Sequence, residues 1–256
     1  MESKTETDES NSQSEYVYGI PRQLTAMSYN IDGLDDRLTS LRLESVFDII
    51  KRVNPDVLFL QKVVKNQENE IRSTLSSSYK IFSSSTNSRY YVLILVRSNI
   101  RVISNQIVRL ERSLMDRNFL FVEAKWNNLH LKLINTHLES CAHFGDIRKQ
   151  QFYQAIDKIK KFATAPNVFG LFGGDLNLED GEASHRAARG DTGRLDRWRI
   201  KRGDGIYLGH GKVDFWLEGK ERTPADLFPS DHFAIVSKFT DLSGFEGKNP
   251  KKCNIL

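Results

Sequence analysis

Polar side chains that can take part in hydrolytic chemistry repeatedly follow short apolar runs in this sequence. Asp175 and Asn177 follow the run VFGLFGG, and His137 follows LHLKLINT. Because sites on layered sheets are built where strands meet loops, such residues can gather at one sheet edge. The positions that share this placement are Asn30, Asp32, Gln61, Lys62, His137, Glu139, Asp175, Asn177, Asp214, Asp231 and His232.

These residue types indicate phosphoryl chemistry. Carboxylate oxygens such as those of Asp32 and Asp175 suit Mg²⁺, which one or two carboxylates hold together with waters and phosphate. Asp175 and Asn177 are two residues apart, so on an extended segment both would face one water or phosphate. His232 adds an imidazole. Taken singly, each has a simpler interpretation, because Asp-x-Asn after glycines is typical of a turn and a lone His of the core or surface.

Apolar periodicity predicts the elements that would position these residues. Leu43, Val46, Phe47 and Ile50 fall on one face of a helix over residues 39–53, and a second helix is expected over 146–162. Strands are expected over residues 24–30, 56–61, 91–96, 119–125, 129–136, 168–174, 212–217 and 233–239. Many strands with few helices predict an α+β fold, an α/β layered sandwich of two stacked, mainly antiparallel β-sheets flanked by helices.

The composition favours one globular domain. The 256 residues are 39% apolar, and we expect the domain over 23–240, a disordered polar tail over 1–22 and a flexible basic tail over 241–256. Two cysteines cannot build a disulfide framework, and the N-terminus has no apolar run, so we expect an intracellular protein of the nucleus, the cytoplasm or both. The net charge of +4 agrees with anionic partners without identifying one.

Six segments together resemble a known family. The segments are YNIDGLD (29–35), FLQ-x-V (59–63), NTHLES (135–140), GGDLNL (173–178), KVDFW (212–216) and PSDHFAI (229–235). In order and approximate spacing they are similar to the endonuclease/exonuclease/phosphatase superfamily. The motifs Asn-Ile-Asp-Gly-Leu-Asp, Thr-His-Leu-Glu-Ser and Gly-Asp-Leu-Asn-Leu together most resemble its 5′-tyrosyl-DNA phosphodiesterases. The resemblance implies a metal-dependent phosphodiesterase that removes tyrosine from DNA 5′ ends.

The resemblance also implies catalytic roles. Asp175 would orient or deprotonate the attacking water, which Asn30 and Asn177 would hold with the phosphate. His232 would stabilise charge on the phosphoryl oxygens, and Asp214 would orient its imidazole.

Four further residues would bind substrate or metal. Asp231 and His137 would lie on the phosphate side, and Asp32 would position Mg²⁺, or Mn²⁺, and its waters. Arg117 would lie near the scissile phosphate, although an arginine before a strand is as often a solvated strand end.

One residue departs from the family pattern at the principal metal ligand. The Glu of the family's Leu-Gln-Glu-Val is Lys62 here. An ammonium repels a cation by about 4 kcal/mol per unit-charge pair at an effective dielectric near 20, so we expect weakened Mg²⁺ binding and an impaired rate. Alternatively, Lys62 itself would neutralise the phosphate as a point charge.

Departures also occur around residue 180. The family's Arg after Asp-x-Asn-Leu is Glu179, and the link from Asp180 to Lys212 is short. The link carries basic residues around Trp198, which could follow a nucleic-acid backbone or form a solvated basic loop. These basic residues are Arg186, Arg189, Arg194, Arg197, Arg199, Lys201 and Arg202.

The C-terminal sequence Cys253-Asn254-Ile255-Leu256 fits a prenylation pattern, although Asn254 is not aliphatic. Lipidation of Cys253 would bring the protein to a membrane surface.

The sequence leaves three hypotheses about function open: a phosphodiesterase for DNA 5′ ends, a pseudoenzyme that still binds nucleic acid or a protein partner, and a membrane-associated lipid or inositol phosphate phosphatase. A monomer is expected in each case.

Overall fold

The structure is a computed structural model of the chain, and it describes residues 23–85, 88–162, 167–178, 212–223, 225–240 and 242. Outside these ranges lie the predicted tails apart from Leu242, Glu179, the basic residues between 186 and 202, and Cys253. Within the described part, no helix is long and apolar enough to cross a membrane.

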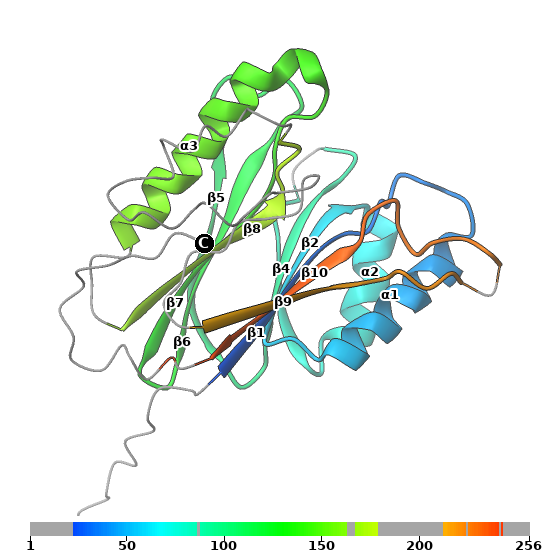
Figure 1. The fold of residues 1–256 in the computed structure, drawn as a ribbon, viewed down its shortest axis with the longest axis horizontal. Helices are drawn as coiled ribbons and strands as arrows, with labels where there is room; N and C mark the ends of the chain where they lie inside the picture. The colour runs from blue at the N-terminus through cyan, green and yellow to red at the C-terminus, as the bar shows by residue number, and fades with distance from the viewer. Residues whose placement is uncertain are drawn as a thin grey trace, which may run out of the picture.

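Two sheets form the centre of the molecule (Figure 1). The six-stranded sheet has the order β3 (Tyr79–Ser83), β4 (Tyr91–Arg97), β2 (Val57–Val63), β1 (Gln23–Asn30), β10 (Ala234–Thr240), β9 (Lys212–Glu218). The four-stranded sheet has the order β5 (Arg101–Arg109), β6 (Asn118–Trp126), β7 (Leu129–His137), β8 (Val168–Asp175). Only β1–β2 and β7–β8 pair in parallel among the described strands, which confirms the predicted fold class.

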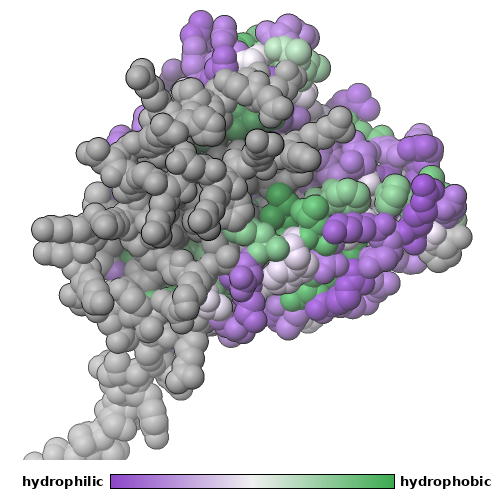
Figure 2. Space-filling view, viewed as in Figure 1, coloured by the Kyte–Doolittle hydropathy of each residue, from purple (hydrophilic) through white to green (hydrophobic). Residues whose placement is uncertain are grey.

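Helices cover the outer face of each sheet. Helices α1 (Thr39–Val53) and α2 (Lys65–Leu75) pack on the six-stranded sheet, and α3 (Gly145–Phe162) packs on the four-stranded one, after the 3₁₀ turn Ala142–Phe144. The four apolar residues predicted for the inner face of α1 are buried. Hydrophilic residues cover the side of the molecule that carries α1 (Figure 2).

The core between the sheets is mainly apolar, and a pair of amide side chains lies in it beneath the candidate site. There the Gln61 amide donates to Asn135 Oδ1 at 2.9 Å, and Asn135 donates to the carbonyls of Leu60 and Leu93 at 3.0 and 2.7 Å. Both amide side chains are buried. Because each amide has its partners, this pair joins the two sheets without leaving unsatisfied groups there.

The two parallel pairs bring the predicted site residues to one edge. Asn30 lies opposite Gln61 at the ends of β1 and β2, and His137 lies opposite Asp175 at the ends of β7 and β8. Gly174 permits this close pairing, because it has a φ of +139° and an added Cβ would lie 2.0 Å from the Thr136 carbonyl oxygen.

Candidate active site

Contacts at the joint edge of the two sheets converge on the Asp175 carboxylate. Its Oδ2 accepts a hydrogen bond from Asn30 Nδ2 at 2.6 Å, and His137 Nε2 and His232 Nε2 lie 3.3 and 3.8 Å from the same oxygen. Asn30 and Asp175 are only 3% and 2% exposed. One carboxylate, one amide and two imidazoles from separate parts of the chain thus meet around a single oxygen atom.

Asn177 has a different geometry from the extended one that the sequence suggests. Its φ is +48°, its N–H donates to Asp175 Oδ1 at 3.1 Å, and its side-chain amide donates to the Leu138 carbonyl at 3.0 Å. The chain therefore turns immediately after β8. The expectation that both side chains face one water from an extended segment is wrong, and Asn177 instead ties the loop after β7 to Asp175.

A hydroxyl that the sequence reasoning missed holds His232 in place. Ser230 is buried, its Oγ donates to the Asn30 carbonyl at 2.6 Å, and it accepts the His232 N–H at 3.1 Å. Its position beside Asp231 was the only signal in the sequence. Asp231 is 56% exposed at its side chain, and its Oδ1 lies 3.5 Å from His232 Nε2.

Lys62 lies between two carboxylates. Its Nζ donates to Asp32 Oδ1 at 3.1 Å and lies 3.8 Å from Asp231 Oδ2. The buried guanidinium of Arg42 is 3.7 Å from the other oxygen of Asp32 and also donates to the Pro229 carbonyl at 3.1 Å. In the sequence Arg42 has the pattern of an ordinary helix residue, so its place beside the site was not predicted.

The donor set around Asp32 does not fit a divalent cation. An ammonium has three donors and no lone pair, so a protonated Lys62 cannot ligate a metal and repels one. Asp32, the predicted Mg²⁺-positioning residue, already contacts two cationic side chains. Among the described residues, no group of three or more His, Cys, Asp or Glu is placed to hold a metal.

His137 is neutral in the folded protein. Burial lowers its pKa well below 6.5, and the positive charges of Arg117, Lys62 and His232 lower it further. Its Nδ1 is buried without a hydrogen-bond partner, while Nε2 faces Asp175. A neutral ring with its proton on Nε2 can donate that hydrogen to the Asp175 carboxylate.

Arg117 lies near the site, with the aromatic ring of Tyr90 between it and His137. Its guanidinium lies 5.2 Å from the centroid of Tyr90, and the Tyr90 ring lies 5.7 Å from that of His137. Arg117 is 5% exposed, and its Nε is 3.7 Å from Glu139 Oε2. The structure therefore places Arg117 behind Tyr90, one ring away from His137.

Comparison with known proteins agrees with this geometry. The sequence profile of the Endonuclease/Exonuclease/phosphatase family matches residues 27–234. The chain belongs to this family. The assignment made from the six sequence segments is thereby confirmed.

Two relatives show which members of the endonuclease/exonuclease/phosphatase family the chain resembles in sequence. The chain is 36% identical to a 5′-tyrosyl-DNA phosphodiesterase of Caenorhabditis elegans, over 85% of this chain and 67% of that protein. The same enzyme of Caenorhabditis briggsae is 37% identical, over 85% of this chain and 69% of the relative.

Solved structures agree. A crystal structure of truncated Caenorhabditis elegans TDP2 matches with a TM-score of 0.75 at 36% identity, over 85% of this chain and 97% of that one. A crystal structure of Danio rerio TDP2 complexed with single strand DNA product matches with a TM-score of 0.74 at 24% identity, over 86% of this chain and 100% of that one. At this identity the match supports the fold alone.

One residue taken from the family pattern is not brought to the site. Asp214 is exposed on β9 opposite Lys238, whereas His232 precedes Ala234, which lies opposite Glu218. At about 3.3 Å per residue, the four residue steps from Ala234 to Lys238 separate Asp214 from the start of β10 by roughly 13 Å. The predicted orientation of His232 by Asp214 is therefore not what the structure shows.

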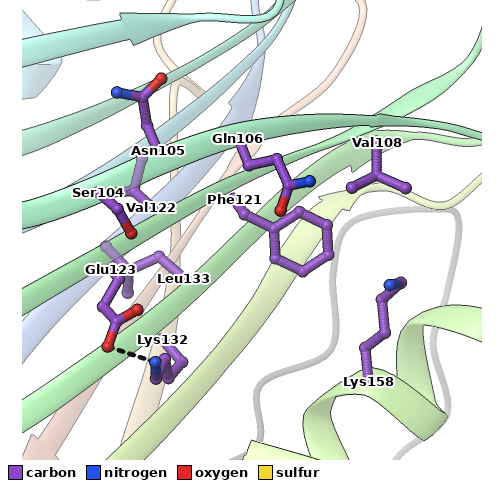
Figure 3. A pocket seen from close by; sticks show the side chains of 10 residues that line it. All are labelled: Ser104, Asn105, Gln106, Val108, Phe121, Val122, Glu123, Lys132, Leu133 and Lys158. Atoms are coloured by element: carbon purple, nitrogen blue, oxygen red, sulfur yellow. Dashed lines mark ion pairs between the residues drawn. The ribbon is translucent and has the colours of Figure 1, made fainter.

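A hollow beside α3 is separate from the family's site residues (Figure 3). Glu123 and Lys132 form an ion pair there, and Lys158 Nζ lies 5.3 Å from the Phe121 ring centroid. The hollow lies along β5 and β6, and none of the predicted catalytic residues lines it.

Proposed function

We propose that the protein hydrolyses a phosphodiester at the 5′ end of DNA, with a 5′-phosphotyrosyl adduct as its substrate. The observation that carries this proposal is the convergence of Asn30, His137 and His232 on the Asp175 carboxylate. The names of the two nematode relatives give the substrate class.

The chain's own residues supply the steps of this reaction. Asp175 accepts a proton from the attacking water, and Asn30 fixes the carboxylate. The water oxygen bonds to phosphorus while the bond to the tyrosine oxygen breaks. The departing phenolate takes up a proton from solvent, which leaves a 5′-phosphate and free tyrosine. His232 donates a hydrogen bond to the phosphoryl oxygens as their charge grows. A phenol with a pKa near 10 is a better leaving group than an alcohol of the DNA sugar, so cleavage on the tyrosine side is favoured.

A second candidate is a pseudoenzyme that binds DNA 5′ ends without cleaving them. The position of Lys62 favours it, because an ammonium does not organise waters as Mg²⁺ does. Its contacts with Asp32 and Asp231 also support the predicted weakening of Mg²⁺ binding. The lipid or inositol phosphatase alternative gains nothing from the relatives, whose names give a DNA phosphodiesterase.

The experiment is incubation of the full chain with three substrates: a 5′-phosphotyrosyl oligonucleotide, its 3′-phosphotyrosyl isomer and an inositol phosphate. Release of tyrosine from the 5′ isomer in clear excess over the 3′ isomer would support the proposal. Binding of the 5′ isomer without release would indicate the pseudoenzyme. Turnover of the inositol phosphate alone would contradict both.

A further inference from the structure

We propose that the Lys62 ammonium is the resident cation of this site and meets the substrate's phosphate in place of a divalent metal ion. The inference deepens the proposed function and rests on it for the identity of the phosphate. The position of Lys62 itself is independent of which substrate enters.

The charges around Lys62 balance without a metal. Asp32, Asp35 and Asp231 supply three negative charges. Lys62, Arg42 and Arg37 supply three positive ones, each within 3.8 Å of one of these carboxylates. Each oxygen of Asp32 already faces a cation, Oδ1 that of Lys62 and Oδ2 that of Arg42. A divalent ion at Asp32 would have to displace the ammonium and then remain beside it.

The backbone around Lys62 is shaped to hold the side chain at this point. Lys62 has a φ of +52°, and the pairing of β2 with β4 shifts register between Leu60 and Val63. The Lys62 carbonyl accepts the Gly33 N–H at 2.9 Å, in the loop that carries Asp32. A lysine in this conformation is unusual, and such strain typically persists at functional sites.

The ammonium is also placed to act on phosphate. The Lys62 side chain is 21% exposed, so its head group is neither sealed in the core nor free in solvent. It shares Asp231 with His232, and His232 faces Asp175. The positive charge of Lys62 also helps to lower the pKa of His137. Lysine binds phosphate as a compact point charge, so the 5′-phosphate would approach Lys62 and His232 together.

Two consequences follow for the wild-type protein. Affinity for a 5′-phosphate should not depend on divalent cations, and Mn²⁺ should not bind at this site. The substitution Lys62→Glu should reverse both properties, because it adds a third carboxylate beside those of Asp32 and Asp231.

The test measures Mn²⁺ binding by calorimetry and by electron paramagnetic resonance on the full chain. The proteins are wild type, Lys62→Glu, Lys62→Met and the control Lys51→Glu, an exposed charge reversal on α1. The same four proteins are titrated with an oligonucleotide bearing a 5′-phosphate and with its 5′-hydroxyl counterpart, in EDTA and in Mg²⁺ at constant ionic strength.

The expected result is Mn²⁺ binding at this site in Lys62→Glu only. Wild type and Lys51→Glu should prefer the 5′-phosphate over the 5′-hydroxyl equally in EDTA and in Mg²⁺. Lys62→Met should lose at least tenfold of that preference in both buffers. Lys62→Glu should recover it only with Mg²⁺.

Mn²⁺ binding by wild type as tight as by Lys62→Glu would overturn the proposal, as would a tenfold gain in wild-type 5′-phosphate preference on adding Mg²⁺. A wild type without any 5′-phosphate preference in EDTA also overturns it. Because these readouts use wild type, misfolding of a variant would not leave the question open. Absence of cleavage in every protein would count against the proposed function and not against the resident cation.

Discussion

At the scale of single residues, Asp175 has the most consequential position, because the side chains of Asn30, His137 and His232 all lie within 3.8 Å of one of its carboxylate oxygens. Its carboxylate is buried, and its oxygens contact Asn30, His137, His232 and the Asn177 backbone. Removing its charge should therefore affect the chemical step far more than the binding of substrate.

Asp175→Asn keeps the shape of the side chain and removes the base. We expect hydrolysis of a 5′-phosphotyrosyl oligonucleotide to fall about 10²- to 10⁴-fold, with oligonucleotide affinity within a few-fold of wild type. Single-turnover cleavage and fluorescence anisotropy measure the two quantities. Asp157→Asn, an exposed change on α3, is the control. Equal rates for Asp175→Asn and wild type would show that Asp175 is not the base.

His137 should make stability depend on pH. Its folded pKa lies below the usual 6.5, so at lower pH the unfolded chain binds the proton and the folded protein does not. The stabilisation is complete above pH 6.5 and is lost as pH falls below it, by up to about 1.4 kcal/mol per pH unit.

Urea unfolding at pH 7.5, 6.0 and 5.0 tests this prediction. His137→Gln should show a shallower loss of unfolding free energy than wild type below pH 6.5. His130→Gln, on the same strand but away from Asp175, should keep the wild-type slope. Parallel slopes for His137→Gln and wild type would contradict the assignment of a buried neutral ring.

At the scale of elements, the loop between β5 and β6 depends on one carboxylate. Glu139 is fully buried after β7, where its Oε1 accepts the N–H groups of Leu114 and Met115 at 2.6 and 3.0 Å. Its Oε2 lies 3.7 Å from Arg117 Nε. In sequence Glu139 resembles its catalytic neighbours, but its contacts are structural.

Glu139→Ala should lower the free energy of unfolding by about 3–5 kcal/mol, because it removes the ion-pair partner of the buried Arg117 and the acceptor of two partly buried backbone N–H groups. Hydrogen exchange should accelerate at the Leu114 and Met115 amides. Chemical denaturation gives the first quantity and exchange measurements the second. The free energy of unfolding should fall less in Glu139→Gln than in Glu139→Ala. It should be almost unchanged in Glu111→Ala, a substitution at an exposed position. Unchanged exchange in Glu139→Ala would refute the anchoring role.

The sequence predicts those helices and strands that bury an apolar face. The eight predicted strands and two predicted helices carry continuous or periodic apolar residues, and all are present. The apolar pattern does not predict α2, whose buried face includes Gln67 and Glu68, or the edge strand β5, which is mostly exposed. The short strand β3 was missed as well. Polar buried faces and solvated edges leave no apolar period to detect.

Apolar patterns likewise predict only part of the candidate site. The ends of β1, β7 and β8 were found because each follows an apolar run, and parallel pairing then places Asn30, His137 and Asp175 together. The turn at Asn177 depends on the sign of one φ angle, which residue type does not specify. The contacts of Lys62 depend on a register shift between β2 and β4, and those of Arg42 on helix orientation.

At the scale of the whole molecule, the site lies where the two sheets meet, and the positive charge is spread widely along the chain. We expect oligonucleotide affinity to fall with rising salt, since phosphate contacts release counterions. Replacing Arg197, Arg199 and Lys201 with Gln should weaken binding of all sequences alike and reduce the salt slope. Anisotropy titrations over a range of NaCl concentrations measure both. An unchanged slope would favour the interpretation of this stretch as a solvated basic loop.

The predicted domain boundaries, intracellular location, monomeric state and lipidation of Cys253 stay predictions. None of them concerns the sheet edge where Asp175, Asn30, His137 and His232 meet.

The most direct measurement is single-turnover cleavage of a 5′-phosphotyrosyl oligonucleotide by the wild-type chain, in EDTA and in Mg²⁺, with Asp175→Asn in parallel. We expect wild type to release tyrosine and a 5′-phosphorylated oligonucleotide in both buffers, and Asp175→Asn to lose this release. Substrate that binds yet stays intact with wild type in both buffers would contradict this expectation and identify a binding protein on a hydrolase fold.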